Sequence, residues 1–236
     1  MTKKHTLRIT KHPEKRKKIM TQAPDRITLP AAKTATHSII WLHGLGADGN
    51  DFAPVIPLLE LRPTTRVILP HAPVRPITVN NGMNMRGWYD IKSFDFNPAD
   101  EDLAAIKDSA AAIAAIAAEE QAQGIPADHI LYAGFSQGGV IALYYGLRHP
   151  CGGILALSTY LADATNTPTA DCDHCPPILQ MHGTQDPVVP YRLGRLAHEQ
   201  LKHKGYAPQW HDYPMQHQVC PPQIADIAEW LHERGY

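Results

Sequence analysis

A serine framed by two glycines has the setting best suited to chemistry in this chain. The segment reads Gly134-Phe-Ser136-Gln-Gly138, with an apolar run before it and a helical pattern after it. In a strand–turn–helix context, a G-x-S-x-G motif strains the serine backbone and lifts the hydroxyl clear of the sheet. The alternative is a glycine-rich helix start that Ser136 merely caps. The pattern makes Ser136 a candidate nucleophile.

A serine hydroxyl needs a general base, and the base needs an acid that orients it. Asp186 lies in a loop just past the apolar run at residues 177–183, and Pro187 and Pro190 stiffen that loop. An aspartate in such a place can also simply cap a turn. Asp186 is the preferred acid, and three aspartates past the preceding apolar run are the alternatives: Asp163, Asp171 and Asp173.

The base is expected downstream, because strand–turn–helix serines of this kind are followed in the chain by the acid and then by a histidine. His198 and His203 fall in a helical pattern among charges, which is typical of a solvated face, and His211 falls inside an extended segment. His217 lies in the loop after that segment and before the last helical pattern. A lone loop histidine is usually exposed and inert, but His217 is the one that this architecture requires.

The developing oxyanion needs two N–H donors. The N–H of Gln137, at the start of the helix after Ser136, is one candidate. The N–H of Leu45 is the other, because it lies in a glycine-rich loop that lets the backbone approach a ligand closely. A phosphate loop is disfavoured, since no Gly-Lys-[Ser/Thr] follows and acidic residues lie nearby. The loop reads WLHGLGADGND and contains Gly44, Gly46, Gly49, Asp48 and Asp51.

The elements that must position these residues alternate between short apolar runs and longer helical patterns, which predicts a mostly parallel sheet covered by helices on both faces, an α/β fold. Two Pro/Asn-rich or polar stretches, 71–97 and 159–176, interrupt the alternation near strand ends, where such sheets bind ligands. The expected strands are 37–44, 66–70, 129–135, 153–158, 177–183 and 207–214. The expected helices are 50–61, 98–123 (capped by Asn97), 136–150, 191–205 and 222–235.

Charge is unevenly distributed along the chain. Residues 1–19 carry eight Lys/Arg and one acid, so the remainder has 22 − 8 = 14 basic and 23 − 1 = 22 acidic residues, a net charge of −8. An acidic body gives no reason to expect nucleic-acid binding. The basic segment lacks the apolar run of a signal peptide and could equally reflect an upstream start codon, with Met20 as the natural first residue. We expect residues 1–25 to be a disordered head or misplaced start, and residues 26–236 to form one domain.

The four cysteines are too few and too scattered for a disulfide-rich secreted scaffold. Cys172 and Cys175 form a C-x-x-C around His174, but no second pair exists to complete a zinc site, and ordinary loop thiols are the preferred interpretation. No run of apolar residues is long enough to span a membrane. We therefore expect a cytoplasmic protein without metal or cofactor.

Four ordered motifs together resemble the phospholipase/carboxylesterase family, the bacterial carboxylesterase and acyl-protein thioesterase group of α/β-hydrolases. They are WLHGLGADGNDF, PHAPVRPITVNNGMNMRGWYDI, GFSQGG and HGTQDPVVP, and the resemblance covers about residues 27–234. It implies a triad of Ser136, Asp186 and His217, oxyanion donors at Leu45 and Gln137, and no metal. It also implies a hairpin-like insertion at about residues 71–97.

The resemblance further implies hydrolysis of short-chain carboxylic esters through an acyl-enzyme, with acyl-protein thioesterase or lysophospholipase activity as the alternative. Trp88 in the family's WYD segment is a candidate substrate-binding residue, with a packed core aromatic as the equally weighted alternative. Members often form homodimers, so a homodimer is a candidate assembly. A non-catalytic binding protein on the same fold is the alternative of another class.

Two departures from the family pattern concern the site. Family members usually carry glycine before the catalytic histidine, where this chain has Gln216, and Gln218 follows His217. If that glycine adopts angles that other residues resist, the loop carrying His217 must take a different path here. The DCDHC segment at 171–175 is the second departure, and we expect it to affect the range of substrates rather than the reaction.

Overall fold

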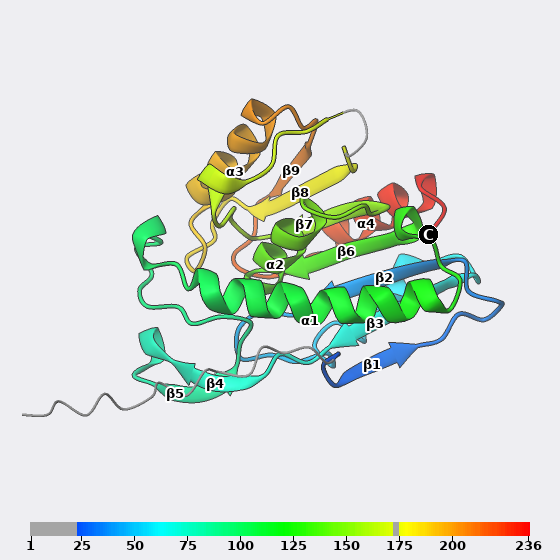
Figure 1. Cartoon of the computed structure of the whole chain (residues 1–236). Helices are drawn as coiled ribbons and strands as arrows, with labels where there is room; N and C mark the ends of the chain where they lie inside the picture. The colour runs from blue at the N-terminus through cyan, green and yellow to red at the C-terminus, as the bar shows by residue number, and fades with distance from the viewer. Residues whose placement is uncertain (1–22, 172–174) are drawn as a thin grey trace, which may run out of the picture.

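The computed structural model describes residues 23–171 and 175–236 of the 236-residue chain. Within them, seven strands form one sheet in the order β1-β3-β2-β6-β7-β8-β9 (Figure 1). β1 pairs antiparallel with β3, and the other neighbouring strands are parallel, which confirms the predicted mostly parallel sheet. The strands are β1 (Arg26–Leu29), β2 (His37–Leu42), β3 (Thr65–Pro70), β6 (Ile130–Phe135), β7 (Gly153–Leu157), β8 (Ile178–Gly183) and β9 (Gln209–Tyr213).

Central strands are buried on both faces, as their continuous apolar sequences require. In β2, Ile40 and Leu42 pack into one core cluster, whereas Ile39 and Trp41 pack into the other. Successive side chains of a strand point to opposite faces, so this alternation builds a core on each side of the sheet.

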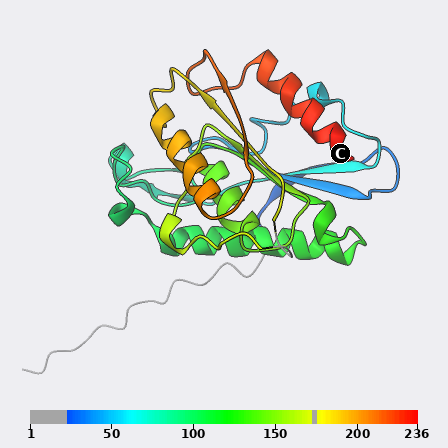
Figure 2. The ribbon, with the colours of Figure 1, turned by 90° about the horizontal axis from the view of Figure 1, so that it is seen from above.

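Helices cover both faces. Core residues of α1, α2 and α3 belong to one cluster, whereas α4 and the turn η1 belong to the other. Seen from above, α1 and α4 lie on opposite sides of the sheet (Figure 2). The helices are α1 (Leu103–Ala122), α2 (Gln137–Gly146), α3 (Tyr191–His203) and α4 (Pro221–Glu233), and the short turns are η1 (Ile56–Leu59), η2 (Thr78–Asn80), η3 (Pro98–Asp100), η4 (Ala127–His129) and η5 (Ala164–Asn166).

The prediction of a helix over residues 50–61 is wrong, because the structure has only the 3-10 turn η1 there. Pro54 and Pro57 lack the N–H donors that a continuous helix needs, and Glu60 adopts a left-handed conformation with φ of 47°. The apolar spacing nevertheless marks side chains that reach the core, namely Phe52, Ile56 and Leu59.

The helix expected from residue 98 starts later. Asn97 does act as a cap, accepting a hydrogen bond from the N–H of Ala99 at 3.1 Å, but it caps η3 rather than α1. Glu101 is extended, and the carboxylate of Asp102 then caps α1 by accepting from the N–H of Ala105 at 3.1 Å. Two capping side chains in succession produced the error in the predicted boundary.

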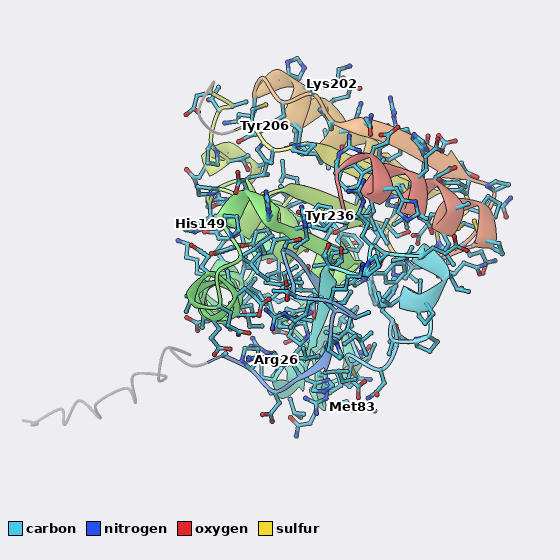
Figure 3. The ribbon with its side chains drawn as sticks, turned by 90° about the vertical axis from the view of Figure 1, so that its right-hand side faces the viewer. Arg26, Met83, His149, Lys202, Tyr206 and Tyr236 are labelled. Carbon is cyan, nitrogen blue, oxygen red and sulfur yellow. The ribbon has the colours of Figure 1, made fainter. Side chains whose placement is uncertain are left out.

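A β-hairpin occupies the first insertion, as the family resemblance implied. β4 (Val74–Ile77) pairs antiparallel with β5 (Met83–Arg86), separate from the main sheet. Asn81 and Gly82 have positive φ at the turn. Figure 3 shows Met83 of this hairpin and Lys202 of α3 at opposite ends of the molecule, so the hairpin extends from the β1 side of the sheet.

Several predictions from the sequence fall on residues outside the described ranges. The basic segment 1–19 is among them, and so are Cys172 and His174 of the C-x-x-C segment. Cys151, Cys175 and Cys220 are free thiols. Among the described residues, no helix has both the length and the apolar character needed to cross a bilayer.

Candidate active site

Ser136 occupies the sharp turn between β6 and α2. Its backbone angles are φ 55° and ψ −120°, a conformation that a residue with a side chain rarely adopts. The turn is held because the Ser136 N–H donates to the carbonyl of Leu157 at 2.9 Å. Although Ser136 stands at the N-cap position of α2, its side chain makes no capping hydrogen bond. This placement favours the nucleophile interpretation over the capping alternative.

The glycines around Ser136 are required by close packing. A Cβ at Gly134 would lie 2.3 Å from the backbone of Gly138, and a Cβ at Gly138 would lie 2.3 Å from the carbonyl oxygen of Leu42. Such distances are far inside van der Waals contact, so any larger residue would force strand and helix apart. Gly138 also brings α2 against the end of β2, where the glycine-rich loop begins.

Asp186 lies in the loop after β8, and its carboxylate is fully buried. One carboxylate oxygen, Oδ1, accepts from the N–H groups of Val188 and Val189 at 2.8 and 2.9 Å. Burial alone would raise the pKa of Asp186, but hydrogen bonds from His217 and from these two N–H groups lower it below the ordinary value. The carboxylate is thus held ionised and in one orientation.

His217 lies after β9, and its Nδ1 is 2.7 Å from Oδ2 of Asp186. Because an ionised carboxylate can only accept, Nδ1 carries the proton and Nε2 is the free base. The imidazole packs against the ring of Phe135, the neighbour of Ser136, with centroids 4.7 Å apart. No hydrogen bond joins His217 to the Ser136 hydroxyl, a contact that often tightens only when substrate binds. The structure therefore brings the three predicted residues to one end of the sheet.

His182 also lies against the carboxylate of Asp186, a contact that the sequence reasoning missed. It is buried, its Nε2 donates to the carbonyl of Val189 at 2.9 Å, and the same nitrogen lies 3.5 Å from Oδ2 of Asp186. Burial lowers the pKa of His182, which keeps it neutral. Its position near the end of a buried strand, four residues before Asp186, was the available signal.

Two backbone hydrogen bonds join the acid loop to the base loop. Thr184 N–H donates to the carbonyl of Tyr213 at 2.8 Å, and Gln185 N–H donates to the carbonyl of Met215 at 3.1 Å. The loops cross at Gly183, where a Cβ would lie 2.4 Å from the Met215 oxygen and 2.5 Å from the Gln216 oxygen. The separation of Asp186 and His217 is therefore set by the β8–β9 pair and by the absence of a side chain at residue 183.

We expect Gly183→Ala to lower kcat for ester hydrolysis by about 100-fold with a smaller change in KM. The added methyl must push the Met215–Gln216 backbone away, and a displacement of about 1 Å in a catalytic group costs this much. Steady-state kinetics on one ester measures the effect. Gly124→Ala is the control, because Gly124 has φ of 92° with open space around it and lies away from the site. We expect that control to lose stability without loss of kcat. An unchanged kcat in Gly183→Ala would contradict the inference that the absence of a side chain at residue 183 sets the separation of Asp186 and His217.

Gln216 does not require the special backbone that would favour glycine. It is absent from the described residues with positive φ, so the loop carrying His217 accommodates glutamine without left-handed strain. We expect Gln216→Gly to change kcat by less than about threefold, since glycine would remove no strain and would only loosen the loop. A large rise in kcat, measured at saturating ester, would show that the native loop holds His217 imperfectly.

The two predicted oxyanion donors lie close to the sharp turn that carries Ser136. A Cβ on Gly44 would be 3.5 Å from the Cβ of Ser136, which places the glycine-rich loop beside the nucleophile. In the described part of the chain, the N–H groups of Leu45 and Gln137 make no hydrogen bond with another group. The side chains of these two residues also approach each other at Gly87. A Cβ on Gly87 would lie 3.0 Å from Cδ1 of Leu45 and 3.5 Å from Oε1 of Gln137. Both N–H groups are thus available near Ser136.

His43 orients the loop that carries Leu45, and the sequence reasoning did not single it out. The N–H of Ala72 donates to its Nε2 at 3.0 Å, so neutral His43 carries its proton on Nδ1 and donates to the carbonyl of Gly44 at 2.7 Å. Burial lowers the pKa of His43 to about 4, which keeps this tautomer neutral. Because the N–H of a trans peptide points opposite to its carbonyl, fixing Gly44 also fixes the direction of the Leu45 N–H.

Trp88 is 1% exposed and braces the same loop. Its indole N–H donates to the carbonyl of His43 at 2.9 Å, and its backbone N–H donates to the side chain of Gln137 at 2.7 Å. This placement favours the packed-core alternative over direct contact of Trp88 with substrate. Trp88 supports the two elements that carry the oxyanion donors.

Among the described residues, three of the alternatives have other partners, whereas the alternative acid Asp173 lies outside the described ranges. The Asp163 carboxylate pairs with Arg148 at 3.3 Å. His198, expected on a solvated face, is buried instead, and its Nδ1 lies 3.0 Å from the side-chain oxygen of Gln180. His211 lies 3.4 Å from Asp226 on an exposed surface. Among the described residues, no group of three or more His, Cys, Asp or Glu side chains is arranged to hold a metal ion.

Comparison with known proteins shows the family of this chain and the fold that it shares. Residues 25–234 match the sequence model of the family described as Phospholipase/Carboxylesterase. Acyl-protein thioesterase 1 of Neurospora crassa is 39% identical over 222 residues, covering 88% of this chain and 91% of the relative. The crystal structure of Arabidopsis thaliana SOBER1 is 28% identical with a TM-score of 0.77, covering 84% of this chain and 98% of that one. Zea mays acyl-protein thioesterase 2, at 24% identity, shares the fold with a TM-score of 0.79 over 90% of this chain and all of its own.

Proposed function

Because the chain belongs to the phospholipase/carboxylesterase family of α/β-hydrolases, we propose that it hydrolyses carboxylic esters through an acyl-enzyme formed on Ser136. The observation that carries the proposal is the 2.7 Å contact of His217 Nδ1 with the buried Asp186, on a histidine packed beside the nucleophile turn. The chain is an enzyme of the hydrolase class, as its acyl-protein thioesterase and carboxylesterase relatives indicate.

In the first half of the reaction, Nε2 of His217 takes the proton of Ser136 as the serine oxygen attacks the ester carbonyl. Asp186 keeps the proton of Nδ1 in place and stabilises the imidazolium that forms. The N–H groups of Leu45 and Gln137 donate to the oxyanion, and each such donor is worth about 3 kcal/mol in the transition state. The imidazolium then gives its proton to the leaving alcohol.

In the second half, water attacks the acyl-enzyme while His217 takes one of its protons. The same two N–H groups hold the second oxyanion, and the returning proton restores the Ser136 hydroxyl as the carboxylic acid leaves. Every proton transfer runs through Nε2 of His217, so the reaction needs no metal or cofactor.

Thioester hydrolysis is the second candidate, and the 39% identity with an acyl-protein thioesterase favours it. The test compares an oxyester and a thioester with the same acyl group, alongside labelling by a fluorophosphonate. Turnover of either ester together with labelling of Ser136 supports the proposal, and the ratio of the two kcat/KM values decides between the bonds. Folded protein that neither turns over esters nor takes the label would instead be a binding protein on the same fold.

A cytoplasmic location and a homodimeric assembly are further proposals, supported by the family resemblance alone. Cell fractionation of the tagged full-length chain tests the location, and light scattering after size-exclusion chromatography tests the assembly. A monomer at micromolar concentration would remove the homodimer.

A further inference from the structure

Each proposed oxyanion donor shares a planar peptide group with the carbonyl of the residue before it. The N–H of Leu45 belongs with the carbonyl of Gly44, and the N–H of Gln137 belongs with the carbonyl of Ser136. Because the N–H and the carbonyl of a trans peptide point in opposite directions, a side chain that binds the carbonyl also aims the N–H. His43 does so for the first peptide by donating to the Gly44 carbonyl at 2.7 Å. An equivalent partner for the second peptide has to donate to the Ser136 carbonyl.

Thr159 is that partner. Its hydroxyl donates to the carbonyl oxygen of Ser136 at 2.7 Å, and the residue is 3% exposed. The same oxygen accepts from the N–H groups of Gly139 and Val140 at 3.0 and 3.3 Å. Those two donors belong to α2 and move with it, whereas Thr159 lies in the loop after β7. The Thr159 bond is therefore the one of the three that fixes the Ser136–Gln137 peptide relative to the sheet.

The backbone on both sides is shaped for this contact. β7 ends at Leu157, and Ser158 then has φ of 46°, a left-handed conformation that a residue with a side chain rarely adopts. On the α2 side, a Cβ at Gly139 would lie 2.7 Å from the Cβ of Thr159 and 2.9 Å from its Oγ1. A side chain at residue 139 would therefore push the hydroxyl away from Ser136.

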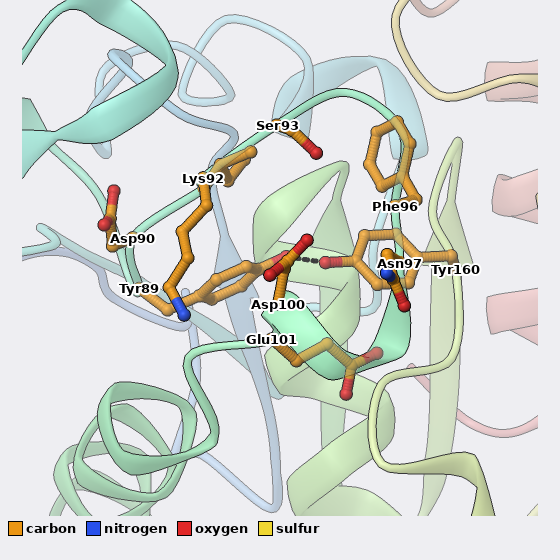
Figure 4. A pocket seen from close by; sticks show the side chains of 10 residues that line it. Tyr89, Asp90, Lys92, Ser93, Phe96, Asn97, Asp100, Glu101 and Tyr160 are labelled. Carbon is orange, nitrogen blue, oxygen red and sulfur yellow. Dashed lines mark hydrogen bonds between the residues drawn. The ribbon is translucent and has the colours of Figure 1, made fainter.

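The next residue, Tyr160, anchors the loop that carries Thr159. Its hydroxyl is hydrogen-bonded to that of Tyr89 at 3.0 Å (Figure 4), and the carbonyl of Tyr89 accepts from the side-chain Nε2 of Gln137 at 2.7 Å. Tyr89 is 2% exposed, so breaking the tyrosine pair would leave a buried hydroxyl without a partner. Hydrogen bonds and the chain itself thus close a ring from Gln137 through the two tyrosines to Thr159 and back to Ser136.

Open space adjoins this loop. A groove of about 280 Å³, the large groove, is lined by Tyr160 together with residues of 96–103, 161–166 and α3. Of the residues in the hydrogen-bonded ring, Tyr160 alone lines it. Because the loop is not packed on every side, its hydrogen bonds determine where Thr159 lies.

We propose that Thr159 is a positioning residue, whose hydroxyl acts through the Ser136 carbonyl to aim the N–H of Gln137 at the oxyanion. It does for this donor what His43 does for Leu45. A hydrogen bond to the carbonyl oxygen also polarises the peptide group, so the N–H becomes a stronger donor. The gain is largest where negative charge develops, so it lowers the barrier more than it tightens ester binding. The inference rests on the proposed function and adds to it a residue outside the triad and the two donors.

The test compares Thr159→Ala with Thr159→Ser, because alanine and serine differ only in the hydroxyl. Steady-state kinetics on p-nitrophenyl butyrate gives kcat and KM, and inhibition by an alkyl trifluoromethyl ketone probes the oxyanion itself. The oxygen of Ser136 adds to the ketone carbon, and the serine proton passes to His217. The ketone oxygen becomes the oxyanion that the two N–H groups hold.

We expect Thr159→Ala to lower kcat by about tenfold, which is less than the loss of a whole oxyanion donor. The inhibition constant of the ketone is expected to rise by about the same factor with little change in KM, because kcat and ketone binding both depend on the oxyanion. Thr159→Ser keeps the hydroxyl and is expected to restore most of both values. A merely structural role would not hold kcat and ketone binding in step at constant KM.

Thr167→Ala is the matched control. It removes another buried hydroxyl that donates to a backbone carbonyl, that of Asp163 at 3.3 Å. We expect this control to lose stability while kcat, KM and the inhibition constant stay at their wild-type values. If Thr159→Ala does not fold, Thr159→Val takes its place, because valine removes the hydroxyl and keeps the bulk.

Labelling by a fluorophosphonate distinguishes failure of this inference from failure of the proposed function. A wild type that hydrolyses butyrate and takes the label, together with a folded Thr159→Ala that keeps wild-type kcat and ketone inhibition, overturns the role of Thr159 alone. A fall in kcat without a matching rise in the inhibition constant also overturns it. A wild type that is neither labelled nor active overturns the proposed function, and the inference falls with it. Matched losses in Thr159→Ala that Thr159→Ser restores support both.

Discussion

Ser136→Ala is expected to lower kcat for ester hydrolysis by about a million-fold, the loss seen when the nucleophile of a serine triad is removed. The hydroxyl is the group that forms the acyl-enzyme, and Ser136 combines a strained turn between a strand and a helix N-terminus with His217 packed beside that turn. Binding and oxyanion donors remain, so a small residual rate above water is expected. Steady-state kinetics and fluorophosphonate labelling measure the effect, and the variant should take no label.

The control for Ser136→Ala is Ser109→Ala, which removes the buried serine hydroxyl that donates to the carbonyl of Trp88. That change is expected to cost stability while labelling persists. A Ser136→Ala protein that keeps wild-type turnover would place the nucleophile elsewhere and remove the proposed mechanism.

Asp186→Asn is expected to lower kcat by about ten-thousand-fold, because the amide favours the wrong tautomer of the base. The carboxylate Oδ2 accepts the Nδ1 proton of His217, whereas Oδ1 accepts from Val188 and Val189. An asparagine that keeps its oxygen toward the two N–H groups must present its NH₂ to His217. His217 then carries its proton on Nε2 and cannot take one from Ser136.

The lowered pKa of Asp186 gives this variant a second signature. A carboxylate whose folded pKa is depressed stabilises the fold above the ordinary aspartate range, and that stabilisation is lost as the pH falls through the lowered value. Asp186→Asn should therefore lose stability near neutral pH and show a weaker dependence of stability on pH in the acid range. Thermal unfolding at several pH values measures it.

Asp163→Asn is the matched control for Asp186→Asn. Asp163 was an alternative acid, and its φ of 51° lies in the left-handed region, which asparagine tolerates well. Its carboxylate pairs with Arg148, so stability is expected to fall while kcat stays within a few-fold. Loss of kcat in Asp163→Asn without loss in Asp186→Asn would exchange the two assignments.

Patterns of burial and chain order were sufficient to predict most of the fold. Continuous apolar runs identified the parallel strands, since two-sided burial leaves no polar alternation to misread. The 50–61 segment was mispredicted because its apolar spacing is helical while Pro54 and Pro57 prevent the helix. β1 was missed because a short antiparallel edge strand, Arg26–Leu29, is only partly buried and carries a mixed sequence.

The candidate site was predictable where the motif and the topology constrained it. Ser136, Asp186 and His217 each follow a strand, and parallel strands bring their ends together, so chain order sufficed to select them. Their assignment as the triad stays a prediction. The contributions of His43 and Gly183 were not accessible, because they depend on which backbone carbonyl lies opposite each residue. Such contacts arise from the packing of loops that are distant in sequence.

Different connections between the strands carry the proposed reacting residues and line the large groove, and this separation matters for the evolution of the fold. The residues proposed for the chemistry follow β2, β6, β8 and β9, and backbone hydrogen bonds between the loops after β8 and β9 hold the acid beside the base. The groove, of about 280 Å³, is lined mostly by two other segments, 96–103 and 160–166, and by residues of α3, and none of the residues proposed for the chemistry lines it. Variation in those segments can therefore change the lining of this groove without rebuilding the reaction centre.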